Sequence, residues 1–379
     1  MHTAEELAKH SGPVRFERAD AWRVRIPMRE PFRISSGEVS QKDAILMRVA
    51  EGSAFGWGES SAMAGAFYSM ETPDTCEREL VEQILPVLSG QLFENLGAVE
   101  AELARLTESR FVRVAVETAA WELAARKRGV ALRQLFGVAN REIPSGLAIG
   151  LYDELNELRQ SIERYRIHDY HRLKVKIKRG QDVDLVSKVR EWFGDFPLFV
   201  DANADYGQED IGVFEQLERY SLMMYEQPMA RRDFAGSACL QRRVTTPVCL
   251  DESIECAEDV RRAAEAGSCR IVNIKLQRVG GFLEAIRVIE ACAIHGIPVW
   301  MGTMPELGVG SAQALVLAAH PAFSFPTDVE PSDRWYTDDV LAEGLHLYQR
   351  NLHVPDGPGL GFRIDMAKVE RYATAHWTF

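Results

Sequence analysis

The sequence predicts an α/β protein in which a (β/α) barrel carries a smaller α+β domain. A chain of 379 residues is longer than one ordinary hydrophobic core requires. From Ile143 onward, short apolar runs alternate with amphipathic helical stretches, whereas the first third has strand-like segments followed by helices. We therefore expect residues 1–135 to form the smaller domain, residues 136–351 the barrel, and residues 352–379 to rejoin the smaller domain.

The smaller domain is predicted from two strand patterns and one helix pattern. Residues 16–26 and 43–49 alternate in the manner of half-buried strands. Residues 111–128 repeat apolar side chains at helical spacing, and Gly129 stands where a C-terminal cap belongs. Residues 1–12 lack the basic and apolar segments of a signal peptide, and we expect them to be loosely ordered.

The barrel is predicted from a regular alternation of apolar runs and helical stretches. A doubly wound open sheet is the alternative, but it calls for a Gly-rich phosphate turn, and the GxGxxG pattern is absent from the sequence. The turn-rich stretch 354–365 is expected to return to the first domain. The eight strand candidates are residues 143–150, 173–177, 197–201, 222–226, 247–251, 271–275, 298–301 and 323–328.

Composition excludes several classes of function. The formal net charge of −12 argues against a nucleic-acid partner, because phosphates need a basic face. No apolar run approaches the roughly 20 residues of a membrane span, so no membrane partner is expected. The six cysteines have no CxxC spacing and are expected to be reduced rather than paired or zinc-bound. With no export signal, the expected compartment is the cytoplasm.

Charged residues end five consecutive predicted strands. Any one of them alone is more often a solvated or ion-paired loop residue. The five lie at successive intervals of 25, 25, 25 and 24 residues, about one strand and helix each. Because barrel strands point their carboxyl ends to one rim, we expect all five side chains at the same mouth. They are, in order, Lys176, Asp201, Glu226, Asp251 and Lys275.

Three adjacent carboxylates in a cleft repel one another unless a cation lies among them. Oxygen ligands select a hard ion, so we expect one Mg²⁺ per chain on Asp201, Glu226 and Asp251. Strand alternation points Lys174 to the same side as Lys176, and this like charge is expected to lower the pKa of the lysine bases. The alternative is that the carboxylates are only salt-bridge partners of the lysines, without a metal.

This order of base, acids and base suits removal of a proton α to a carboxylate. Such a proton is too weakly acidic for lysine unless the developing enediolate charge is stabilised, which a metal on the carboxylate oxygens does. A base on each side then permits removal and return of the proton, or removal with departure of a leaving group.

Six motifs in chain order resemble those of the enolase superfamily, muconate-lactonizing subgroup. This resemblance covers almost the whole chain. It implies a modified (β/α)7β barrel with an α+β capping domain, Mg²⁺ on the three carboxylates, and Lys176 and Lys275 as the acid/base pair. The motifs are LKVKIKRG (173–180), FVDANADY (199–206), MYEQP (224–228), CLDES (249–253), VNIKLQRVGG (272–281) and MGTMPELGVG (301–310).

The resemblance also implies the residues around the metal and the substrate. Asn203 and Glu252 are expected behind the metal ligands, with Lys174 beside the bases. Loops 31–37 and 60–69 are expected to cap the substrate. The implied substrate contacts are Ser35, Phe67, Tyr68, Arg278, Met304 and Glu306.

Within the subgroup, three segments are most similar to o-succinylbenzoate synthases and N-succinylamino acid racemases: EPFRISSG (30–37), GWGESSAMAGAFYSMET (56–72) and PSDRWYTDDV (331–340). Leu276-Gln277 departs from the Pro-Gly usual after the second lysine of this branch, and residues 302–307 keep only part of its strand-seven loop. Asp328 and Glu330 are weakly similar to an Asp-x-Asp of dipeptide epimerases. These departures concern the substrate side and leave the metal and base positions intact.

The resemblance implies dehydration of 2-succinyl-6-hydroxy-2,4-cyclohexadiene-1-carboxylate to o-succinylbenzoate, a step of menaquinone biosynthesis, with Lys176 as the proton-transferring base. Racemisation of N-succinylamino acids by both lysines is the alternative, and dipeptide epimerisation or muconate cycloisomerisation are weaker ones. A barrel that only binds a carboxylate is a further possibility, but the complete set of five charged residues favours an enzyme. The expected partners are a small carboxylate substrate and further copies of the chain, as a dimer or octamer.

Overall fold

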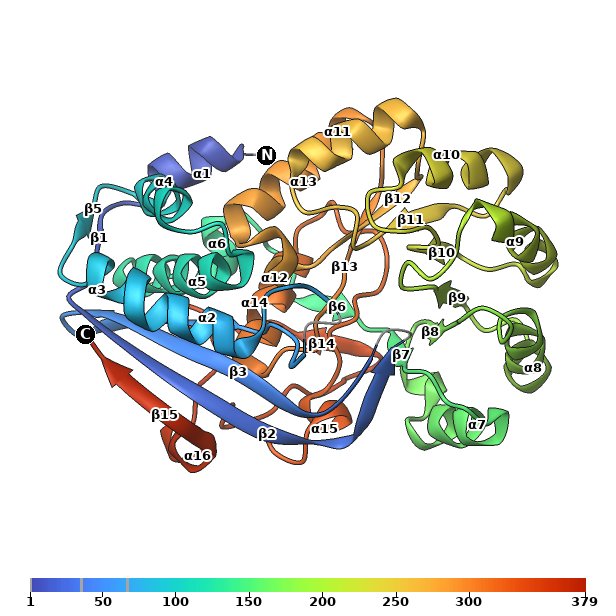
Figure 1. Ribbon diagram of the computed structural model, residues 1–379. Helices are drawn as coiled ribbons and strands as arrows, with labels where there is room; N and C mark the ends of the chain where they lie inside the picture. Colours follow the sequence, from blue (N-terminus) through green and yellow to red (C-terminus); the bar gives the residue numbers. More distant parts are fainter. Residues whose placement is uncertain (1, 35–36, 66–67) are drawn as a thin grey trace.

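The computed structural model describes residues 2–34, 37–65 and 68–379. Figure 1 shows two parts, an antiparallel sheet with its helices on one side and a barrel of parallel strands on the other. The predicted fold class, an α/β barrel with an α+β capping domain, is confirmed.

The capping domain is built on a four-stranded antiparallel sheet in the order β15-β2-β3-β4. The long strands β2 and β3 pair from Arg18↔Ala50 onward and run to the mouth of the barrel (Figure 1). There the amide of Leu151 donates a 3.0 Å hydrogen bond to the carbonyl of Arg33. The C-terminal strand thus completes this sheet. The bounds are β2 Arg18–Ile34, β3 Gly37–Glu51, β4 Ala54–Ser60 and β15 Ala373–Thr378.

Helix α5 (Arg110–Lys127) packs on this sheet and confirms the helix predicted over 111–128. The hydroxyl of Ser109 caps its first turn, and Gly129 follows it at φ +66°. Almost all its side chains are buried, because the sheet covers one face and the barrel helices cover the other. The remaining helices of this part are α2 Pro73–Glu79, the π-helical η1 Leu80–Ile84, α3 Leu85–Leu88, α4 Leu96–Leu106 and α6 Leu132–Leu135.

The expectation of a loosely ordered start is wrong for the described residues. Ala4–His10 form helix α1, which begins with a reciprocal capping box between Thr3 and Glu6. The amide of Ala4 donates a 2.9 Å hydrogen bond to the carboxylate of Glu290 on a barrel helix. The Thr-x-x-Glu signature was present in the sequence, but the docking partner lies far away along the chain.

The contact between α5 and β4 depends on two glycines. A Cβ atom on Gly58 would lie 1.7 Å from the carbonyl oxygen of Ala115, and one on Gly56 would lie 2.1 Å from that of Ala119. Both obstacles are backbone atoms, which cannot rotate away.

We expect Gly58→Ala to lower the free energy of unfolding by about 3 kcal/mol, the upper range for overpacking a core. The matched control is Gly212→Ala on helix α9, where a Cβ meets nothing within 4 Å. That substitution should leave stability unchanged or raise it by up to about 1 kcal/mol. Urea unfolding measures both, and equal midpoints for the two variants would contradict the close packing of β4 against α5.

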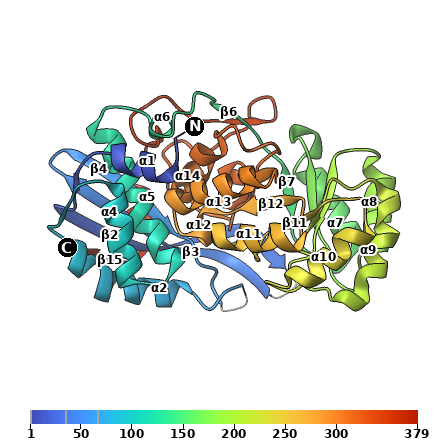
Figure 2. The ribbon, with the colours of Figure 1, turned by 90° about the horizontal axis from the view of Figure 1, so that it is seen from above.

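The barrel sheet has seven parallel strands that neighbour one another in chain order, which excludes the doubly wound alternative. Helices lie outside the strands (Figure 2). The strands are β7 Leu147–Ile149, β8 Leu173–Lys176, β9 Leu198–Asp201, β10 Tyr225–Glu226, β11 Val248–Leu250, β12 Ile271–Ile274 and β13 Val299–Met301. The helices are α7 Leu155–Arg164, α8 Val183–Phe193, α9 Ile211–Leu217, α10 Phe234–Arg243, α11 Ala257–Ala266, α12 Leu276–Val279, α13 Phe282–Ile294, α14 Gly308–Ala318 and α15 Ser332–Trp335. Helix α16 (Met366–Tyr372) instead packs on β2 of the capping sheet.

The eighth predicted strand, residues 323–328, closes the barrel through isolated bridges rather than a regular strand. Phe323 bridges Val299 of β13, and Thr327 bridges Ser145 just before β7. Pro326 interrupts the run, since proline has no N–H for a strand ladder.

The first predicted strand, 143–150, is split. Its start forms β6 (Glu142–Pro144), which pairs with β14 (Asn351–His353), and only Leu147–Ile149 enters the barrel. In the described part of the chain, no helix is both long enough and apolar enough to span a bilayer.

Candidate active site

The five charged residues predicted at strand ends do meet at one end of the barrel. Lys176, Asp201 and Glu226 are the last residues of β8, β9 and β10, and the register pairs Lys176 with Asp201 and Asp201 with Glu226. Asp251 and Lys275 follow β11 and β12 directly. All five are at least nine-tenths buried. The spacing of one strand and helix per charge therefore predicted their common location correctly.

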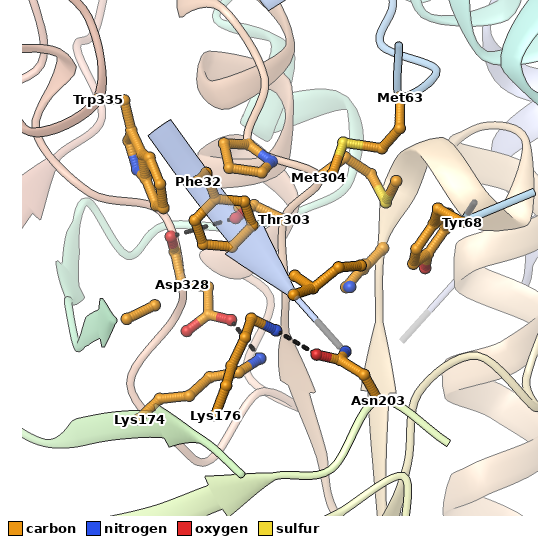
Figure 3. A pocket seen from close by; sticks show the side chains of 14 residues that line it. Phe32, Met63, Tyr68, Lys174, Lys176, Asn203, Thr303, Met304, Asp328 and Trp335 are labelled. Atoms are coloured by element: carbon orange, nitrogen blue, oxygen red, sulfur yellow. Dashed lines mark hydrogen bonds and ion pairs between the residues drawn. The ribbon is translucent and has the colours of Figure 1, made fainter. Parts of the chain in front are cut away.

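The lysines contact the carboxylates directly. The Nζ atom of Lys176 lies 2.7 Å from Asp201 Oδ2, and that of Lys275 lies 2.8 Å from Asp251 Oδ2. Lys174, which points inward beside Lys176 (Figure 3), places its Nζ 2.8 Å from Glu226 Oε2 and 3.1 Å from Asp201 Oδ2. An ammonium group thus bridges two of the three predicted metal ligands.

As they stand, the described residues bring no group of three carboxylate, histidine or cysteine side chains close enough to hold an ion. The local chemistry nevertheless suits a cation. Burial, followed by repulsion from Asp201, raises the pKa of Glu226 to about 8. The Lys174 ammonium already bridges Asp201 and Glu226, so positive charge is accommodated between these oxygens. All three side chains offer the oxygen donors that Mg²⁺ prefers.

The expectation of a lowered pKa is wrong for Lys275 when only the protein groups act on it. Burial lowers the pKa of Lys275, and Lys174 lowers it further, but Asp251, Tyr68 and Glu252 together raise it by more, so the net direction is upward. The pKa of Lys174 is also raised: burial opposes its charge, while Asp201, Asp328 and Glu226 favour it. Carboxylates in direct contact act more strongly than a like-charged neighbour.

Asn203 and Glu252 lie beside the carboxylates, as the resemblance implies. The side-chain oxygen of Asn203 accepts a 2.7 Å hydrogen bond from Lys176, and its amide donates to Glu252 Oε1 at 3.1 Å and to Asp201 Oδ2 at 3.3 Å. Asn203 has a left-handed backbone at φ +43°, which asparagine tolerates better than most residues. Asn203 therefore fixes the ammonium of Lys176 relative to two acids.

A cavity lies directly above the lysines, with a polar floor and an apolar roof (Figure 3). Phe32 and Trp335 meet edge to face at 5.1 Å between ring centroids. The Nζ atom of Lys176 lies 5.6 Å from the Phe32 ring centroid, and that of Lys275 lies 5.4 Å from the Tyr68 centroid. Each flanking lysine thus faces an aromatic ring. The cavity is lined by Phe32, Ile34, Met63, Tyr68, Ala148, Lys174, Lys176, Asn203, Lys275, Thr303, Met304, Pro305, Asp328 and Trp335.

Only some of the residues expected to contact the substrate line the cavity. Tyr68 and Met304 line the cavity. Arg278 does not: the turn of α12 directs it back onto Asp251, and its Nε donates to the carbonyl of Ile254 at 2.8 Å. Ser35 and Phe67 lie outside the described residues.

Glu306 also does not line the cavity. Its carboxylate accepts a 3.1 Å hydrogen bond from the amide of Met304 at the interface of the two domains. There burial raises its pKa to about 7, against the attraction of Lys42. The Glu306 carboxylate thus bonds within its own loop and lies outside the cavity, so the prediction of a substrate contact is corrected.

Several lining residues were missed, although the sequence held signals for them. Phe32 and Trp335 lie in two of the motifs quoted for the resemblance. Asp328 ends the eighth apolar run just as the other charged residues end theirs, and it accepts a 3.1 Å hydrogen bond from Lys174. The sequence analysis named Asp328 only for its similarity to a motif of dipeptide epimerases, whereas the strand-end rule applied to that run would have placed it at the barrel mouth.

Known proteins share this architecture. Residues 18–137 match the mandelate racemase / muconate lactonizing enzyme N-terminal domain family, and residues 157–368 match the enolase C-terminal domain-like family. An o-succinylbenzoate synthase of Geobacillus kaustophilus is 38% identical over 350 residues, covering 92% of this chain and 93% of the relative. An N-succinylamino acid racemase of an Amycolatopsis species is 40% identical over 342 residues, covering 89% and 92%. The crystal structure of an enolase superfamily member from Listeria innocua has a TM-score of 0.91 at 33% identity, covering 96% of this chain and 99% of that chain. These matches confirm the resemblance, and the chain belongs to the mandelate racemase and muconate lactonizing enzyme family of the enolase superfamily.

Proposed function

We propose that the protein is a Mg²⁺-dependent enzyme that removes a proton α to a substrate carboxylate, and that it acts as an o-succinylbenzoate synthase. The observation that carries this proposal is the placement of Lys176 and Lys275 on the two flanks of Asp201, Glu226 and Asp251, beneath one cavity with an apolar roof. Amines on both sides of a carboxylate cluster suit proton transfer at a carbon held between them.

Asp201, Glu226 and Asp251 would hold the ion. Bound there, a divalent ion supplies positive charge that stabilises an enediolate and lowers the pKa of nearby ammonium groups. Lys176, held by Asn203, removes the α-proton and returns it to the departing hydroxyl group. Lys275 stays protonated and stabilises the enediolate by its charge.

The buried setting of both lysines also favours a second candidate, racemisation of N-succinylamino acids. Lys275 is as deeply buried as Lys176, at 6% exposure each, and it likewise faces an aromatic ring. It can therefore exchange a proton on its own side of the substrate. Relatives with both activities match most of the chain.

The weaker alternative of dipeptide epimerisation loses support, because the carboxylates that suggested it already have partners. Asp328 accepts hydrogen bonds from Lys174 and Arg172. Glu330 accepts a 3.0 Å hydrogen bond from the amide of Ala148 and does not line the cavity. Neither is free to bind the ammonium group of a dipeptide.

Parallel turnover assays with Mg²⁺ test the proposal. We expect kcat/KM for the cyclohexadiene carboxylate to exceed that for N-succinylamino acids by about tenfold or more, a difference of roughly 1.4 kcal/mol in transition-state binding. The reverse order would make racemisation the main activity. Turnover of a dipeptide or a muconate alone would reject both. A homo-oligomer, Mg²⁺ as the specific ion and a cytoplasmic location stay predictions.

A further inference from the structure

One side-chain amide fastens the capping domain to the barrel beside Lys275. Gln277, on helix α12, is 1% exposed. Its Nε2 donates a 2.9 Å hydrogen bond to the carbonyl of Glu59, and its Oε1 accepts a 2.9 Å hydrogen bond from the amide of Ser61. A single amide therefore satisfies one backbone acceptor and one backbone donor at the end of β4, as a neighbouring strand would do.

The segment beyond this contact needs such an anchor. Residues 61–72 connect β4 to α2, and the part that the structure describes forms no helix or strand. The same turn is held a second time, because the Glu59 carboxylate accepts 2.7 Å hydrogen bonds from the amides of Leu307 and Gly310 at the start of α14. The beginning of the segment is thus fixed to two barrel helices.

The aromatic ring that this segment contributes faces one lysine, whereas the other lysine faces a ring from elsewhere. The segment carries Tyr68, whose ring centroid lies 5.4 Å from the Nζ of Lys275. Lys176 instead faces Phe32, which comes from β2 (Figure 3). A change in the anchor should therefore act unequally on the two sides of the cavity.

We infer that Gln277 is a positioning residue: its hydrogen bonds to Glu59 and Ser61 fix the point where the chain leaves β4, so that Tyr68 lies over Lys275, and they thereby set the reactivity of the Lys275 side relative to the Lys176 side. The inference rests on the proposed function, because it assigns the two lysines to opposite sides of a bound substrate. The structural part of the inference, that Gln277 anchors the chain after β4, does not depend on which reaction the enzyme catalyses.

The test compares Gln277→Met with Gln313→Met. Gln313, on α14, is also fully buried, and its Nε2 donates a 2.8 Å hydrogen bond to the carbonyl of Trp57 within β4. Each substitution keeps side-chain volume and removes an amide between the same two domains, but only the first releases the segment.

Proton NMR in deuterated buffer measures α-proton exchange of the two enantiomers of N-succinylphenylalanine with the Mg²⁺-loaded enzyme. We expect Gln277→Met to change the ratio of the two exchange rates by about tenfold or more, since small misplacements near reacting groups are costly. Gln313→Met should keep the ratio within about twofold of wild type, because it lies away from the segment. An unchanged ratio in Gln277→Met, or an equal change in both variants, overturns the inference.

Amide hydrogen exchange followed by mass spectrometry tests the fastening separately. Peptides covering residues 61–72 should lose protection by about tenfold in Gln277→Met and keep it in Gln313→Met. Failure of the wild-type enzyme to turn over the cyclohexadiene carboxylate would reject the proposed function, and failure to exchange either α-proton would reject the racemase candidate and the unequal reactivity inferred here. Unchanged protection in Gln277→Met overturns the fastening itself, whatever the reaction. Gln277→Ala provides the same comparison without the bulk of methionine.

Discussion

Lys176→Ala is expected to lower kcat by about 10²–10⁴-fold, the range that a positioned general acid or base contributes. The amine is held 2.7 Å from both Asp201 Oδ2 and Asn203 Oδ1, so its place beneath the cavity is well defined. A methyl group there leaves the Lys176 side of the substrate without a base. Because substrate binding depends on other groups, KM should change much less than kcat. Steady-state turnover of the cyclohexadiene carboxylate measures both constants.

The third lysine of the same run provides the control. Lys178 follows β8 by two residues, has a side chain 34% exposed, and lies 3.8 Å from Asp153 outside the cavity. Lys178→Ala should therefore keep kcat within about twofold, as expected for a surface substitution. A kcat for Lys176→Ala above about one tenth of wild type would contradict its assignment as the base.

The common location of the charged strand-end residues could be predicted because it depends on a structural unit, one strand and one helix, that repeats along the chain. Each unit of strand and helix returns the chain to the same end of the barrel, so residues such as Asp201 and Glu226 meet whatever their distant neighbours are. Asp328 also ends an apolar run and lies at the same barrel end, but Pro326 interrupts the strand pattern of that run.

The apolar roof of the cavity could not be predicted in the same way, because its residues come from distant parts of the sequence. Phe32 and Trp335 are about 300 positions apart in the sequence, and they meet only because the β2–β3 hairpin reaches the barrel mouth. Arg278 was misassigned because the direction of its side chain depends on the turn of α12, which spacing from Lys275 does not reveal. The sign of the lysine pKa shift likewise depended on contacts below 3 Å.

Buried carboxylates at the domain interface form a second group that sequence patterns did not distinguish. Glu59 and Glu117 both belong to the capping domain, yet each accepts backbone hydrogen bonds at the start of a barrel helix. Burial raises the pKa of Glu117 to about 7, in spite of the two amide donors of Phe282 and Leu283. Such residues look like ordinary surface acids until the two domains are placed together. They add polar contacts to the apolar core that the two domains share, and together these hold the cap above the lysines.

Adding Mg²⁺ is expected to raise the melting temperature of the wild-type protein, and Glu226→Gln is expected to abolish this rise together with turnover. An ion that binds only the folded state at 100 times its Kd stabilises it by about 2.7 kcal/mol. For a chain of this length that corresponds to roughly 3 °C. Glutamine preserves the shape of Glu226 but removes the central charge of the three carboxylates, so the ion loses affinity. Differential scanning calorimetry with MgCl₂ and with EDTA measures the shift.

Glu330→Gln is the control for Glu226→Gln. It also removes a buried acid at this end of the barrel, but one that is not a predicted metal ligand. Glu330 is 3% exposed, and the amide of Ala148 donates to it rather than a lysine. Its replacement should keep the Mg²⁺-dependent rise, because the oxygens of Asp201, Glu226 and Asp251 are untouched. If Glu226→Gln retained the full rise, the ion would have to bind elsewhere. The three carboxylates would then form only a buried network of salt bridges with Lys174, Lys176 and Lys275, without an ion.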